Sequence, residues 1–122
     1  MIRGDRGQST LEFALVLPLI ALLLLGLVQI GVIARDRVAL VHAAREGVRV
    51  AVVDPSPRAV TVAVRGATSL DPSALRVELT GGTGSGDLVT VVVRYTCRTD
   101  VAVTGSVVPD VEMSERFSAV IE

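Results

Sequence analysis

Residues 13–34 form an uncharged apolar stretch that constrains the fold of this chain more than any other feature. Gln29 is its one strongly polar side chain. A helix rises about 1.5 Å per residue, so this stretch would span roughly 33 Å, close to the ~30 Å hydrocarbon core of a bilayer. Pro18 would weaken a soluble helix, but membrane helices tolerate proline because their surroundings re-satisfy the backbone. The sequence therefore predicts a transmembrane helix near the N-terminus.

Two other interpretations of this stretch are less favoured. A buried helix of a soluble core is disfavoured, because so short a chain cannot easily surround a long and uniformly apolar helix. A secretory signal peptide cleaved near Ala34 is supported by Arg3 and Arg6 and by the small-x-small character of residues 32–34. However, the apolar run exceeds the usual core of a signal peptide, and Glu12 lies where such peptides avoid acids. We expect the helix to be retained.

Composition argues against several partners and chemistries. The chain has 12 Arg and no Lys against 13 acidic residues. It therefore lacks the excess of positive charge that would indicate nucleic-acid binding. Two Phe, one Tyr and no Trp leave few platforms on which bases could stack. The single cysteine, Cys97, permits no intramolecular disulfide, and we interpret it as a small strand residue.

No catalytic or ligand-binding constellation is evident. The one histidine, His42, and the one cysteine have neither metal-ligand spacing nor a paired nucleophile and base. The acidic residues are scattered singly, as on a solvated surface. We therefore predict a protein that is not an enzyme, with no catalytic residues, no cofactor and no metal.

The helix is expected to continue past the membrane as an amphipathic segment over residues 35–53. Apolar residues recur there at spacings of three and four, which predicts a stripe packed on a partner surface, presumed here to be a sheet. The predicted stripe consists of Val38, Val41, Ala44, Val48 and Val52. Gly47 weakens the helix by about 1 kcal/mol relative to alanine, a loss that packing must offset.

Residues 54–122 are predicted to form a small α+β domain. Asp54-Pro55 ends the long helix, and Ser56-Pro57 is the cap and first turn typical of a new one, here expected over residues 57–68, with a strand as the alternative. Period-two alternation then predicts antiparallel strands. The first strand covers residues 75–80, and a hairpin loop follows at Gly81–Gly86. The next strand has Val89, Val91, Val93 and Tyr95 on its inward face, and the last covers residues 112–121. A further short edge strand is predicted around Val101–Thr104.

The N-terminal motif resembles a known family. The run Arg6-Gly7-Gln8-Ser9-Thr10-Leu11-Glu12-Phe13-Ala14-Leu15-Val16-Leu17-Pro18 is similar to the opening of the TadE-like proteins of the tight-adherence (Tad) pilus system, and residues 43–49 are similar to the family's post-membrane helix. In that family a basic leader, a glycine and a Glu-Phe pair precede an apolar helix. The resemblance covers about the first 50 residues; beyond them only the sheet-like character matches.

The resemblance implies an α+β fold of the type IV pilin kind, with a long N-terminal helix packed on a small antiparallel sheet. It also implies a minor pilin or pseudopilin of a Tad-type pilus or secretion system. On this view residues 1–7 are a leader that a prepilin peptidase removes between Gly7 and Gln8. Glu12 and Phe13 are the implied assembly residues. Type IV pilins commonly carry phenylalanine where this chain has Gln8.

The physics of residues 8–12 fits that implication. A free ammonium at Gln8 and the Glu12 carboxylate can neutralise each other within or between subunits, which offsets the cost of placing each charge at the membrane edge. A carboxylate near a helix N-terminus is also favoured by the helix dipole. The implied partners are the membrane, the prepilin peptidase and other copies or other subunits of the pilus machinery, in a homo- or hetero-oligomer.

Orientation is where two signals conflict. Arginines lie on both sides of the apolar stretch, and the count taken alone leans toward a cytoplasmic C-terminus. The Val/Thr/Ser-rich C-terminal part is instead typical of an exported domain. We expect a single-pass protein of the inner (cytoplasmic) membrane with an extracytoplasmic C-terminal domain, and possible incorporation into an extracellular pilus. The alternatives are a membrane anchor of another envelope or secretion complex, or an exported adhesive module that uses the Gly81–Gly86 loop or a strand edge.

Overall fold

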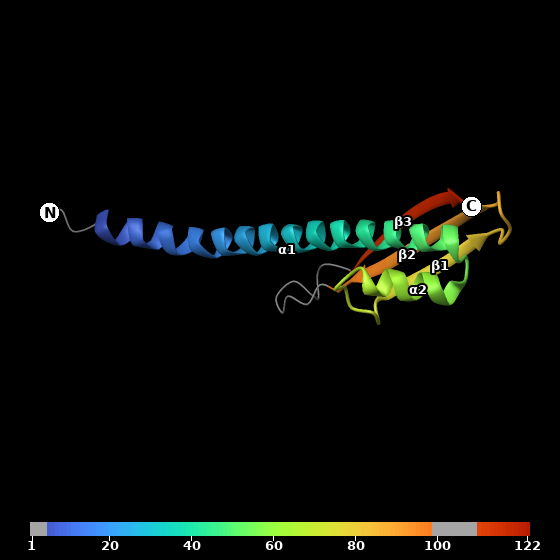
Figure 1. The fold of residues 1–122 in the computed structure, drawn as a ribbon. Coiled ribbons are helices and arrows are strands. Elements are labelled where there is room, and N and C mark those ends of the chain that lie inside the picture. The colour runs from blue at the N-terminus through green and yellow to red at the C-terminus, as the bar shows by residue number, and fades with distance from the viewer. Residues whose placement is uncertain (1–4, 99–109) are drawn as a thin grey trace. The chain divides into compact units, whose positions relative to one another are not determined.

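The computed structural model describes residues 5–98 and 110–122, with two helices and three strands (Figure 1). The predicted edge strand at Val101–Thr104 lies outside the described residues. The chain divides into two compact units, residues 1–34 and residues 35–122. A single helix, α1 (Asp5–Val53), contributes to both.

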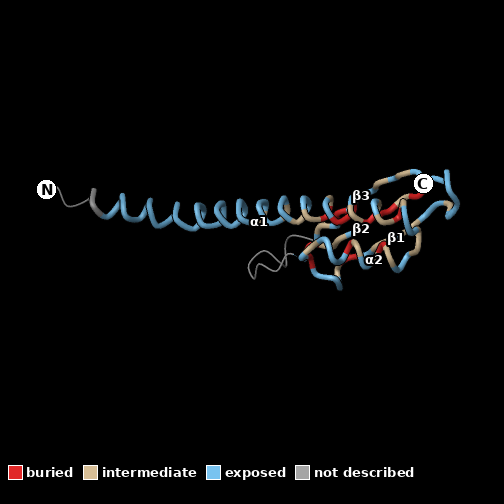
Figure 2. The backbone as a smooth tube through the Cα atoms, in the orientation of Figure 1, coloured by how far each residue is buried: buried red, intermediate tan, exposed pale blue. Residues whose placement is uncertain are grey.

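The N-terminal unit consists of the first part of α1. Its large apolar side chains are exposed from Leu11 to Val32 (Figure 2). Within Gly7–Val53 the helix is long and apolar enough to cross a membrane; its most apolar part has a mean hydropathy of 2.7 and is not buried. Pro18 lies inside the helix, as membrane helices allow. These residues do not form a soluble core within the described chain.

The turn between α1 and α2 (Pro57–Gly66) follows the local signals of the sequence. α1 ends at Val53, directly before the Asp54-Pro55 pair. Ser56 is the N-cap of α2, and its hydroxyl accepts a hydrogen bond of 3.3 Å from the Ala59 amide. Pro57 occupies the first turn, where its missing N–H costs no hydrogen bond. The predicted helix is confirmed over the strand alternative, and it is slightly shorter than expected.

The sheet is a three-stranded antiparallel meander. Its strands are β1 (Leu75–Gly81), β2 (Leu88–Cys97) and β3 (Val111–Val120), in the order β1-β2-β3. β1 pairs with β2 from Leu75↔Tyr95 to Gly81↔Val89, and β2 pairs with β3 from Leu88↔Val120 to Cys97↔Val111. The predicted α+β class, a long helix with a small antiparallel sheet, is confirmed.

The hairpin between β1 and β2 depends on glycine at two positions. Gly81 and Gly86 have φ values of 126° and 87°, which side-chain-bearing residues rarely adopt. The Asp87 carboxylate folds back into the loop and accepts a hydrogen bond of 3.0 Å from the Gly84 amide. The loop is therefore occupied by the chain's own carboxylate, which disfavours an anion there.

The core of the C-terminal unit lies between the helices and one face of the sheet. On that face β2 contributes fully buried valines, and α2 contributes Val60 and Val64. A Cβ built on Gly47 of α1 would lie 2.6 Å from Val64 Cγ2 and 3.3 Å from Val91 Cγ1. At residue 47, α1 therefore lies close against both α2 and β2.

The buried face of α1 is not the predicted valine stripe. The prediction was wrong about most of it: Val38 is 60% exposed, Val41, Val48 and Val52 are half-buried, and Ala44 alone is buried. The face that packs on the sheet and on α2 consists instead of Leu40, Ala43, Ala44, Gly47 and Ala51. Small side chains let the helix approach closely, and the packing of Gly47 supplies the compensation that its low helix propensity required.

The other face of the sheet is largely polar. Thr90 and Ser118 lie opposite each other there, and their hydroxyl oxygens are 2.8 Å apart. Val92 also points to this face and is nevertheless buried, between Glu78 of β1 and Arg116 of β3 in the strand register. The aliphatic stems of long charged side chains can cover an apolar residue in this way.

Candidate assembly segment on the N-terminal helix

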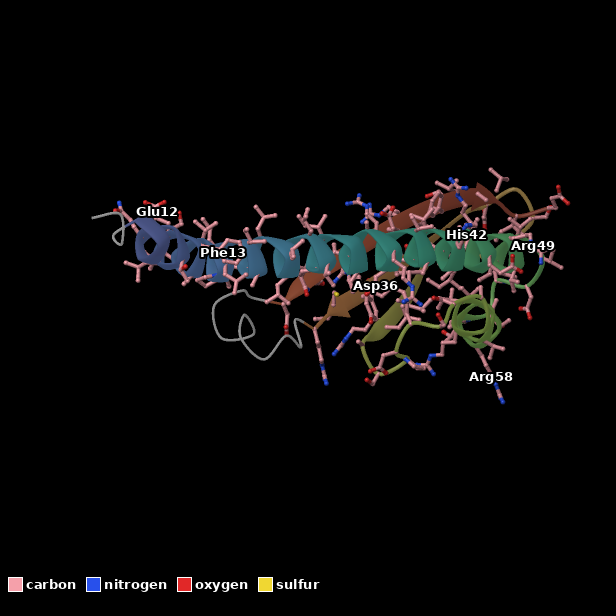
Figure 3. All side chains as sticks on the ribbon, turned by 90° about the vertical axis from the view of Figure 1, so that its left-hand side faces the viewer. Glu12, Phe13, Asp36, His42, Arg49 and Arg58 are labelled. Atoms are coloured by element: carbon pink, nitrogen blue, oxygen red, sulfur yellow. The ribbon has the colours of Figure 1, made fainter. Side chains whose placement is uncertain are left out.

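The residues singled out from the sequence all lie on α1, one after another. Gly7, Gln8, Glu12 and Phe13 are helical and exposed. Figure 3 labels Glu12 and Phe13 on this part of the helix. A Cβ built on Gly7 would meet no atom within 4 Å, so the fold of this chain places no packing demand on glycine there. A requirement for glycine at position 7 would therefore have to come from another molecule.

Gln8 and Glu12 are one helical turn apart. Residues at this spacing share a face of a helix, so the backbone nitrogen of residue 8 and the Glu12 side chain lie on neighbouring turns. None of the ion pairs within the described part of the chain involves Glu12. Its carboxylate lies exposed at the start of the apolar part of the helix.

Phe13 lies near the start of the exposed apolar surface. Its side chain is 65% exposed, and the neighbouring Leu11 and Leu15 are exposed to a similar degree. Such a surface is costly in water but suits lipid or the apolar helices of other subunits. The arrangement of a carboxylate followed by an unbroken apolar helix can bind and orient other helices; it offers no reactive group.

The remaining candidates from the sequence do not converge on this segment. His42 is exposed on α1, and Cys97 is buried at the end of β2. Within residues 5–98 and 110–122 no group of three or more His, Cys, Asp or Glu side chains could hold a metal ion. The thiol of Cys97 donates a hydrogen bond of 3.5 Å to Asp36 Oδ2. Burial raises the pKa of this thiol, and the neighbouring Asp36 carboxylate raises it further, so Cys97 stays in its neutral form.

A second surface was missed by the sequence reasoning. Arg37 and Arg45 of α1 both reach β3: Arg37 Nε lies 3.5 Å from Glu115 Oε1, and the Arg45 guanidinium lies 5.7 Å from the centre of the Phe117 ring. The same two arginines line a surface depression of about 360 Å³ with Val38, Val41 and His42. Periodicity could not identify this surface, because it arises from a strand more than 60 residues away.

The comparison with known families gives a match for the first part of the chain. The model of the family described as TadE-like protein matches residues 7–49. This segment is TadE-like. The resemblance stated from the sequence motif is therefore confirmed over these residues. No curated protein and no solved structure matches the chain.

The TadE-like match includes every residue of the candidate assembly segment. It begins at Gly7, includes Glu12 and Phe13, and ends at Arg49, four residues before α1 ends. TadE-like proteins belong to Tad pilus assembly and are not known as enzymes. The sheet and α2 lie beyond the match, so their role has to be argued from their own geometry.

Proposed function

We propose that this chain is a non-enzymatic component of Tad-type pilus assembly, a minor pilin or pseudopilin. The observation that carries the proposal is the combination on one TadE-like helix of Gly7, Glu12 and an apolar surface that nothing in the described chain covers. A helix of this kind is long and apolar enough to cross a membrane. An exported α+β unit would follow the span and remain outside the cytoplasm.

The proposed maturation follows from the same segment. Residues 1–7 would be a leader, removed by a prepilin peptidase between Gly7 and Gln8. Residues 8–34 would then span the membrane, residues 35–53 would continue the helix into the extracytoplasmic space, and residues 54–122 would complete the exported unit. The exposure of Gly7 supports access by a peptidase, and a Cβ built there would meet no atom within 4 Å.

Glu12 would act as the docking group. After cleavage the new ammonium at Gln8 lies one turn from the Glu12 carboxylate, and the two opposite charges offset each other's desolvation cost within a subunit or between subunits. A carboxylate left unpaired in hydrocarbon is unfavourable. Pairing between subunits would therefore favour the association of a newly inserted subunit with the growing assembly.

The N-terminus of the protein purified from its native membrane tests the proposed maturation. Intact mass and N-terminal sequencing should give a chain that starts at Gln8. A chain that starts at Arg35 would indicate a signal peptide and remove the membrane role of Glu12. A chain that retains Met1 would favour a plain membrane anchor of another envelope complex.

Replacement of Glu12 tests the docking role. We expect Glu12→Ala and Glu12→Gln to insert into the membrane and be processed normally, yet to reduce surface pili at least tenfold, because the pairing charge is lost. Pili would be sheared from cells and quantified, and the membrane fraction would be blotted for the subunit. Ser9→Ala, an exposed change on the same segment, is the matched control and should leave pili at the normal level. Wild-type pili in both Glu12 variants would show that Glu12 does not dock the subunit.

A further inference from the structure

β3 presents a long and regular edge. It is the last strand in the order β1-β2-β3, and in the described part of the chain its pairing partner is β2 alone. The strand has ten residues without proline, and its register with β2 runs unbroken from Val111 to Val120. Proteins usually protect such an edge with a bulge, a proline or a very short strand, because it can otherwise pair with another chain. β3 has none of these three devices; of the other common ones it carries charged side chains, including Glu115, which faces the inner side and pairs with Arg37.

The rows of residues across the sheet show what kind of strand fits this edge. The register aligns Glu78 of β1, Val92 of β2 and Arg116 of β3 in one row on the outer face. A second copy displaced sideways by one sheet width would continue the row, so that its Glu78 lies beside Arg116 of the first copy. Opposite charges on directly neighbouring strands attract, whereas like charges repel.

The adjacent rows are also compatible with this placement. On the inner face, Leu79 of the second copy would lie beside Phe117 of the first, and both side chains are half-buried in the single chain. On the outer face, Thr80 would lie beside Ser118, which continues the hydroxyl pair of Thr90 and Ser118. Apolar side chains left half-exposed at both edges would thus be covered by the same step.

The depression on α1 extends this edge into a broader surface. Two of its lining residues, Arg37 and Arg45, contact Glu115 and Phe117 of β3, so the depression runs beside the strand. Val38 in its lining is 60% exposed. A chain paired along β3 would bring its own inner layer next to this depression, where an exposed valine gains from burial.

The direction of the helix decides between the two edges that a second copy could offer. Asp36 lies against Cys97 and Gly47 approaches Val91, so residues 35–53 of α1 run antiparallel to β2 and in the direction of β3. Pairing of β3 with β3 about a two-fold axis would make these helical segments run in opposite directions. Pairing of β3 with β1 keeps them in the same direction, because β1 and β3 are parallel within a copy. Subunits inserted by one route into one membrane need the second arrangement.

We propose that copies of this chain associate side by side, with β1 (Leu75–Gly81) of one copy forming a parallel pair with the edge of β3 (Val111–Val120) of the next. The contact is head-to-tail and therefore open-ended, so it can add copies in a row. The Glu78–Arg116 row fixes its register, although Glu78 Oε2 also lies 3.7 Å from an Arg94 nitrogen in its own copy. The proposal rests on the proposed function only for the common orientation of the copies.

Disulfide cross-linking of the full chain in its native membrane tests this arrangement. The background is Cys97→Ser, which removes the one native thiol. In a chain carrying both Glu78→Cys and Arg116→Cys, mild oxidation should give a ladder of dimers and higher oligomers. Within one chain these positions are two strand spacings, roughly 10 Å, apart, which is too far for an internal bridge.

Several variants make the result specific. Glu78→Cys alone and Arg116→Cys alone should give no dimer, while cells that express both single variants should give a dimer. Thr80→Cys with Ser118→Cys, one row away in the same register, should give the same ladder. This second pair keeps the test valid in case the first pair perturbs the sheet. Arg58→Cys on α2 with Arg116→Cys is the matched control, and it should remain monomeric.

Each other outcome overturns the proposal. Dimers of Arg116→Cys alone would indicate two-fold pairing of β3 with β3. No cross-link in either row pair would mean that β1 of a second copy does not pair with this edge. Failure here is distinguishable from failure of the proposed function: normal pili without cross-links refute the side-by-side pairing alone, whereas a ladder in a strain whose pili do not depend on this protein refutes the pilus role alone.

Discussion

Residues 13–34 and residues 35–53 belong to the same helix but are built in opposite ways. The first region carries bulky apolar side chains on all sides, and those up to Val32 are exposed. The second region buries one face, and that face is formed mainly of alanine and glycine. A helix surrounded by lipid or by interchangeable helices needs no particular face, whereas a helix packed on a sheet needs a face that permits close approach.

The polar contacts of the second region also have no counterpart in the first. Arg37 pairs with Glu115, Arg49 Nε donates a hydrogen bond of 3.0 Å to Glu46 Oε2, and Asp36 accepts one from the Cys97 thiol. Two of these contacts join residues of α1 to the sheet.

The largest contrast between the two regions is expected from leucine truncation. Leu40 is fully buried, so Leu40→Ala should lower the free energy of unfolding of the C-terminal unit by about 2–5 kcal/mol through lost burial and a residual cavity. Leu24 is 55% exposed in the first region, and Leu24→Ala should leave that free energy unchanged. Urea denaturation of the full chain in mild detergent, followed by the fluorescence of Tyr95, measures both. Equal losses would show that the two regions unfold as one unit.

Glycine replacement should give the next largest contrast. Gly47→Ala should destabilise the C-terminal unit by about 1–3 kcal/mol, because the new methyl group overlaps Val64 in a packed core. This loss opposes a gain of about 1 kcal/mol in helix propensity. In the first region, Gly31→Ala meets no atom within 4 Å and should not destabilise the chain. A stabilised Gly47→Ala variant would mean that α1 packs less closely than the structure has it.

The smallest effect concerns pH. The pKa of Cys97 is raised on folding, mainly by burial, so the neutral thiol is favoured in the folded state. Its contribution to stability is therefore fully present below the unfolded thiol pKa of about 8.5 and is lost as the pH rises through the folded value. Between pH 7 and pH 10, wild type should lose more stability than Cys97→Ser in the same denaturation measurement. An identical decline in the two proteins would mean that a group other than Cys97 causes the loss of stability at high pH.

The sequence predicted correctly whatever depends on neighbouring residues. Asp54-Pro55 ends α1 because proline cannot continue a helix, and Ser56-Pro57 begins α2 because a hydroxyl cap and a fixed φ suit its first turn. The period-two strands follow from side chains that alternate between two faces of a sheet. The proposed cleavage residues Gly7 and Gln8 and the proposed assembly residues Glu12 and Phe13 come from a local motif and stay a prediction; the structure adds that all four are exposed on one helix.

Only the tertiary structure decided which face of residues 35–53 is buried. Hydrophobic periodicity selects the larger apolar residues, so it predicted the valines, but the sheet and α2 approach α1 where side chains are smallest. Burial of Val92 on a polar face and the depression beside β3 arise in the same way, from strands that meet only when the chain folds. The sequence by itself determined an apolar helix, its end and the strand pattern, since these are local properties. Close packing between distant residues depends on shape, which periodicity does not encode.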